Sequence, residues 1–187
     1  MSLVELIAQA DERGLAASGL ACLDRCVPLL GGDDEILRPL WASLADDPAD
    51  WGPRLEQARG TLTGPEMADE SVEDGAALLA RRMLAAAPAD RSPGEVRVWA
   101  DACSVASLQI HRFLDPAEDE AADVDTRREG RTDGMSPLVA AELRRQITVL
   151  ELLAGHGPAG LRGALEVSTE GRRVLRAVVS RRARGRV

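Results

Sequence analysis

Residues 15–30 read LAASGLACLDRCVPLL, and this apolar stretch decides how we interpret the rest of the chain. As a helix, it would carry apolar side chains at nearly every angle around its axis. Only Ser18, Asp24 and Arg25 are expected to require water. A helix that is apolar on every face is usually buried on every face. We therefore expect residues 15–30 to form a buried central helix that the other elements enclose.

Helix signals flank this segment on both sides. Ser2 and Glu5 form a capping box for a first helix, which we expect to stop at Gly14. Ser-Pro pairs predict the starts of two longer helices, because proline is favoured at the first helical position. Those two helices are expected over 93–114 and 138–154, and others over 36–44, 48–62, 71–87, 158–167 and 169–182. This pattern predicts a single all-α domain over 1–187, a bundle of about six to eight helices.

The two long helices each show an inward-facing stripe. In 93–114 the stripe is widened by Trp99 and Phe113, and it consists of Val96, Ala100, Cys103, Ser107, Ile110 and Leu114. In 138–154 an apolar row faces inward, and Glu142 is the one acid beside it. We expect both stripes to pack on the central helix.

Two segments are expected to lie outside the packed bundle. Residues 116–134 are acidic and contain Val124 as their only large hydrophobic residue, so we expect a mobile surface loop. Residues 183–187 follow the last apolar stripe and are expected to fray.

The composition indicates a cytoplasmic protein. The start of the chain lacks the basic segment of a secretory signal, and no apolar run approaches a membrane span of roughly 18 residues. Three cysteines, an odd number, argue against a disulfide framework. Lysine, asparagine and tyrosine are absent, and their A/T-rich codons point to a GC-rich, actinobacterial genome. All 23 basic residues are therefore arginine, so an arginine cluster is less informative here.

Charge divides sharply along the chain. Residues 1–156 hold 15 arginines against 29 acids, a net charge of −14, whereas residues 157–187 hold eight arginines against two acids, a net charge of +6. The C-terminal arginines surround a narrow apolar stripe, and we treat five of them as candidate partner-binding residues: Arg172, Arg173, Arg176, Arg181 and Arg182. We expect this helix to dock on the acidic body, its arginines meeting carboxylates in 66–74 or 118–125. Nucleic acid is disfavoured as a partner because the body would repel phosphate.

A metal site has only weak candidates. Cys22 and Cys26 share one helix face, and Cys103 or His111 could complete a ligand set. Structural zinc sites normally use closer CxxC pairs, so we expect the cysteines to pack as small hydrophobic residues and His111 to be a core histidine. No catalytic residue and no cofactor are predicted, since the chain lacks GxSxG and phosphate-binding loops.

These observations favour a non-catalytic protein-binding module, an adaptor or regulator that binds a protein partner or associates with itself as a homodimer. One alternative is a metal-dependent hydrolase or small-ligand-binding bundle, with its site between the helices that bear His111 and Glu142. A second alternative is nucleic-acid binding through the arginine-rich C-terminal helix.

Overall fold

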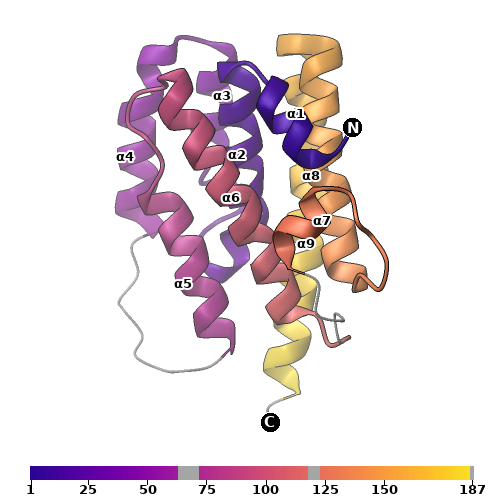
Figure 1. Ribbon diagram of the computed structural model, residues 1–187. Coiled ribbons are helices and arrows are strands. Elements are labelled where there is room, and N and C mark those ends of the chain that lie inside the picture. The colour runs from indigo at the N-terminus through magenta and orange to yellow at the C-terminus, as the bar shows by residue number, and fades with distance from the viewer. Residues whose placement is uncertain (63–71, 118–122, 186–187) are drawn as a thin grey trace.

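The computed structural model describes residues 1–62, 72–117 and 123–185, which form the expected all-α bundle without a strand (Figure 1). Eight of its α-helices have seven residues or more, in agreement with the prediction, and α7 is shorter. The α-helices are α1 Leu3–Gln9, α2 Glu12–Cys26, α3 Arg38–Ala45, α4 Trp51–Leu62, α5 Val72–Ala85, α6 Pro93–Leu114, α7 Val124–Arg128, α8 Pro137–His156 and α9 Gly160–Arg184. Short 3-10 turns occur at Val27–Leu29, Pro48–Asp50 and Gly157–Ala159.

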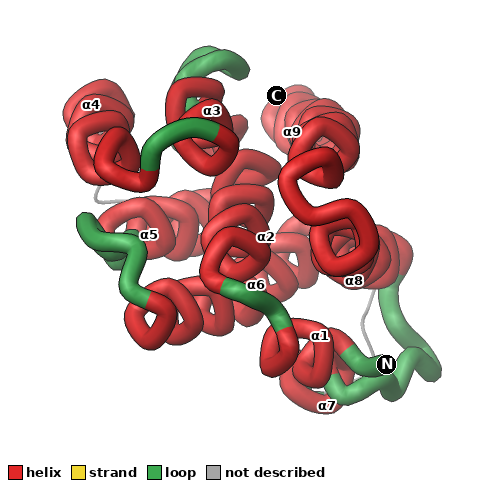
Figure 2. The backbone as a smooth tube through the Cα atoms, turned by 90° about the horizontal axis from the view of Figure 1, so that it is seen from above, coloured by secondary structure: helices red, strands yellow, loops and turns green. Residues whose placement is uncertain are grey.

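Helix α2 is the centre of the bundle. Figure 2 shows it in the middle, with α3, α9, α8, α6 and α5 around it, and α2 packs on all of these helices. Every residue from Gly14 to Cys26 is buried, which confirms the predicted central helix. The expectation that Ser18, Asp24 and Arg25 require water is wrong, because all three are at most 2% exposed. The two charged residues are buried because each pairs with an opposite charge from another helix.

The ends of α2 differ from the sequence prediction. The break before it falls after Gln9, since the Asp11 carboxylate accepts a hydrogen bond from the Gly14 backbone N–H (2.7 Å) and caps α2. Gly14 therefore lies inside α2 and does not end α1. The 3-10 turn follows α2, and Gly31 then adopts a φ of 69°, a left-handed conformation that glycine allows at low cost.

Two tryptophans fix α4, α5 and α6 to one another and to α2. The rings of Trp51 and Trp99 meet edge to face at 5.9 Å between centroids. The Trp99 indole donates to the backbone oxygen of Met83 (2.9 Å), and its ring packs on Gly19 of α2. A Cβ atom at Gly19 would lie 2.7 Å from Trp99 Cζ3, so the glycine allows α6 to approach α2 closely.

Helix α9 is continuous, whereas the sequence predicted two pieces with a break near residue 168. Ser168 does not interrupt it, because its hydroxyl donates to the backbone oxygen of Ala164 within the same helix (2.9 Å). The C-terminal end of α9 projects beyond the other helices in Figure 1. The helix continues to Arg184, into the segment expected to fray, and residues 186–187 lie outside the described residues.

The acidic segment 116–134 is not a loop throughout. Its residues 124–128 form α7, which packs against α6 with Val124, Arg127 and Arg128 buried. Arg127 Nη1 donates to the backbone oxygen of Asp133 (2.5 Å), which ties the following turn to α7. The single large hydrophobic residue and two arginines thus anchor part of the segment, while residues 118–122 lie outside the described residues.

Candidate functional site

A fully buried ion pair joins α2 to α8 at the centre of the molecule. Arg25 Nε and Nη2 donate to the two oxygens of Glu142 at 2.8 and 2.6 Å, and both side chains are 0% exposed. This two-pronged geometry is the strongest form of an arginine–carboxylate contact. It is also required here, because a buried charge without a partner costs several kcal/mol, on the order of 3–5.

Two further side chains donate to the Glu142 carboxylate. Ser107 Oγ on α6 lies 2.8 Å from Glu142 Oε1, and Gln146 Nε2 on α8 lies 2.9 Å from the same oxygen. Burial by itself would raise the pKa of Glu142, but Arg25, His111 and Gln146 outweigh burial and lower it to about 2. The carboxylate is therefore held ionised and is saturated with donors.

A chain of hydrogen bonds continues from this carboxylate to the surface. Gln146 Oε1 accepts from Ser104 Oγ (2.7 Å), and that hydroxyl accepts from Arg128 Nε on α7 (3.1 Å). Arg128 in turn pairs with Asp101, whose side chain is 52% exposed. The sequence did not point to Ser104 or Arg128, because neither belongs to a motif. The hydrogen-bond network that contains them joins four separate helices, α2, α6, α7 and α8.

His111 lies against this network, as the sequence predicted for a core histidine. Its Nδ1 atom is 2.7 Å from the backbone oxygen of Ser107, so Nδ1 carries the hydrogen and donates it. Its Nε2 atom is 3.6 Å from Glu142 Oε2. Burial lowers the pKa of His111, although Glu142 opposes the effect. The structure thus brings together His111 and Glu142, the pair named for the hydrolase alternative, but at 1% and 0% exposure no substrate reaches them.

The three cysteines are free and buried. Cys22 Sγ accepts from Arg25 Nη2 (3.5 Å), and Cys26 Sγ lies 3.9 Å from Ser107 Oγ. Burial raises the pKa of the Cys22 thiol to about 12 and raises those of Cys26 and Cys103 as well. These thiols therefore hold their protons inside the core. Within the described ranges, no three His, Cys, Asp or Glu side chains are grouped as metal ligands.

The arginine-rich helix docks on the acidic body through a second set of ion pairs. Arg172 Nη1 lies 2.5 Å from Asp24 Oδ1 on α2, and Arg172 Nε lies 3.5 Å from Asp34, which also pairs with Arg176. Docking on the body was expected, but on carboxylates in 66–74 or 118–125. Of those segments, residues 66–71 and 118–122 lie outside the described residues. Burial raises the pKa of Asp24, and Arg172 opposes that rise.

The five arginines named as partner-binding candidates therefore have different environments. Arg172 is 5% exposed, and its side chain is engaged by Asp24 and Asp34 of the same chain. Arg176 is half exposed beside Asp34, and Arg182 donates to the backbone oxygen of Leu114 (3.5 Å). Arg173 and Arg181 are exposed on α9.

Exposed apolar side chains occur on both α5 and α6. Five large apolar side chains are exposed in the described part of the chain, and three belong to these two helices: Val98 (72%), Phe113 (47%) and Leu78 (44%). The interpretation of Phe113 as a widening of the inner stripe is therefore wrong. We define the α5–α6 face by six residues: Leu78, Val98, Ala102, Val105, Gln109 and Phe113.

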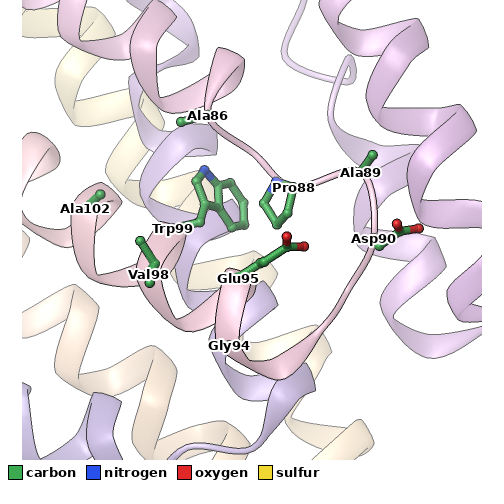
Figure 3. Close-up of a pocket in the computed structure, with 9 residues that line it drawn as sticks. All are labelled: Ala86, Pro88, Ala89, Asp90, Gly94, Glu95, Val98, Trp99 and Ala102. Carbon is green, nitrogen blue, oxygen red and sulfur yellow. The ribbon is translucent and has the colours of Figure 1, made fainter.

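An open hollow of about 590 Å³ lies at one end of the α5–α6 face (Figure 3). Its lining is apolar with two acids, and consists of Ala86, Pro88, Ala89, Asp90, Gly94, Glu95, Val98, Trp99 and Ala102. Figure 3 shows the rings of Trp99 and Pro88 projecting into it between α6 and the preceding loop. The lining contains no histidine, cysteine or serine, so the hollow offers apolar contact rather than nucleophilic chemistry.

None of the helices within the described residues is both long enough and apolar enough to span a membrane. Compared with known proteins, the chain matches no family model, no curated protein and no solved structure.

Proposed function

We propose that the chain is a non-catalytic protein-binding module, an adaptor or regulator, and that it binds its partner through the α5–α6 face. The observation that carries this proposal is the exposure of Val98, 72%, in line with Phe113 on the same side of α6. Contiguous exposed apolar surface is a mark of interaction sites, whereas single exposed apolar residues are ordinary. The adjoining hollow gives a partner side chain a place to insert.

The buried network supports a non-catalytic role. His111 and Glu142 are the residues best suited to acid–base chemistry, and both are enclosed by α2, α6 and α8. Glu142 is also saturated by donors from all three helices. The network therefore supports packing of the core and gives the hydrolase alternative no open site.

The proposal is tested by a photo-crosslinking residue at position 98, with one at position 162 as control. Arg162 is 89% exposed on α9, so both probes meet the same solvent. We expect position 98 to yield covalent adducts of defined mass in the cells that produce the protein, with the attached chain identified by mass spectrometry. Equal adduct yields at positions 98 and 162 would contradict the proposal.

A second variant separates binding from folding. Phe113→Glu places a charge on the α5–α6 face, and we expect adducts at position 98 to be lost because a partner would bury that charge. Phe113 is half exposed, so the melting temperature should change little. Persistence of the adducts in the Phe113→Glu variant would count against the α5–α6 face as the binding surface.

A further inference from the structure

The outer stripe of α6 has the spacing of a helix-packing seam. Its residues, Val98, Ala102, Val105, Gln109 and Phe113, follow one another at intervals of three or four positions. That spacing places all five on one side of the helix, as in coiled coils. Phe113 at one end is the largest residue of the stripe and Ala102 is the smallest, so a second helix can approach most closely beside Ala102.

The stripe is complementary to itself when it is reversed. Around the midpoint between Val105 and Ala106, Val98 and Phe113 are equally distant, and so are Ala102 and Gln109. An antiparallel copy of α6 therefore sets Val98 against Phe113 at both ends. A two-fold dimer requires this property, because the same patch must serve both subunits.

Charges at the edge of the stripe agree with the same arrangement. Asp101 and Arg112 are eleven positions apart, three helical turns, and so lie along one edge. Antiparallel pairing about that midpoint brings Arg112 of each copy to within about 3 Å, along the helix axis, of Asp101 on the other copy. Asp101, which already pairs with Arg128 of its own chain, then also meets Arg112 of the other copy, and this contact occurs twice. Glu95 lies beyond the overlap of the two α6 helices.

We propose that the partner is a second copy of this chain, an inference that rests on the proposed function. The two α6 helices pack antiparallel across a two-fold axis between Val105 and Ala106. Phe113 of each copy covers Val98 of the other, and Leu78 borders the contact. The alternative occupant, an apolar helix of another protein, would not require complementarity between the two ends of the stripe.

The first test is the mass of the full chain by sedimentation velocity over a range of concentrations. We expect a monomer–dimer equilibrium, and Phe113→Glu should weaken association at least tenfold. Arg162→Glu also inserts a glutamate at an exposed helical site, but away from the α5–α6 face, and should leave the dimer intact. Circular dichroism verifies that both variants remain folded.

The second test fixes the register by disulfide formation. Ala102→Cys mixed with Gln109→Cys should form a mixed disulfide, because these positions face each other in the dimer. Either variant alone should not, since identical positions lie about 10 Å apart along the axis, beyond the ~7 Å reach of a disulfide. The native cysteines are buried and do not compete.

The outcomes distinguish this inference from the function on which it rests. A wild-type monomer at all concentrations, with position 98 crosslinked to another protein, overturns the homodimer and keeps the binding face. A dimer that survives Phe113→Glu, or that gives no selective mixed disulfide, also overturns the inference. If position 98 gives no adducts, either in cells or with the purified chain, the proposed function itself is overturned.

Discussion

At the scale of single residues, the ion pair between Arg25 and Glu142 is the central polar contact of the interior. The sequence marked Glu142 as the one acid beside an inward stripe, but it could not identify its partner. The two residues are 117 positions apart, and their contact depends on how α8 crosses α2. The charge of Arg25 suggested a water-facing position, whereas the structure shows an arginine that is buried because its charge is matched by Glu142.

Replacing Glu142 by glutamine should destabilise the fold strongly. The change leaves Arg25 buried without its counter-charge, and we expect the free energy of unfolding to fall by about 3–5 kcal/mol. Urea denaturation provides the measurement. Glu151→Gln, on the exposed side of the same helix, serves as control and should change stability by no more than about 0.5 kcal/mol. A small effect of Glu142→Gln would contradict the role assigned to the pair.

The same residue predicts acid sensitivity. The pKa of Glu142 is lowered from 4.5 to about 2 in the folded protein, so its contribution to stability is present above pH 4.5 and is lost as the pH falls towards 2. We expect the free energy of unfolding to decline over this window, and to decline less in Glu142→Gln. Parallel pH profiles for the two proteins would show that another group is responsible.

At the scale of elements, helix caps predicted α6 and α8 well, because Ser-Pro pairs act locally. Two boundaries were wrong although the contacts that set them are also local: Asp11 caps α2 through Gly14, and the Ser168 hydroxyl bonds within α9 and does not break it. The packing of α9 on α2 also requires a residue that no pattern marks. Gly171 lies against the Arg25 and Arg145 side chains, and a Cβ there would be 2.9 Å from Arg145 Cδ and closer still to Arg25 Cδ.

Gly171→Ala should therefore destabilise the protein, although alanine favours a helix by about 1 kcal/mol over glycine. Arg25 cannot yield because Glu142 holds it, so we expect a net loss of about 1–3 kcal/mol from overpacking. Gly155→Ala in α8 is the matched control, since nothing lies within 4 Å of its added Cβ, and it should be neutral or stabilising. Thermal unfolding compares the two, and a more stable Gly171→Ala would refute close packing at this site.

At the scale of the whole molecule, the sequence predicted the all-α class and the enclosed central helix, since both follow from composition and periodicity. It did not predict the α5–α6 face, because Phe113 also fitted the edge of the inner stripe. The prediction that the basic C-terminal helix docks on the acidic body is confirmed, and the contacts are made through Asp24 and Asp34. The sequence did not identify Asp24 as a partner of α9, because this residue belongs to the buried central helix itself.

Truncation separates the packed part of α9 from its projecting end. A chain that stops after Ser180 keeps Arg172 and Leu175, which is 0% exposed, and should retain cooperative thermal unfolding. A chain that stops after Ala159 leaves Asp24 without its counter-charge and uncovers α2, so it should lose cooperative unfolding by circular dichroism. Equal melting of both truncated chains would mean that α9 contributes little to the fold.

The three buried thiols can report on local opening of the core. Cys22, Cys26 and Cys103 sit on two neighbouring helices, and each keeps its proton at neutral pH. An alkylating reagent can modify them only while the surrounding helices are separated. The labelling rate of each thiol therefore reports how often its part of the interior opens, and equal rates at all three would mean that α2 and α6 open in one event.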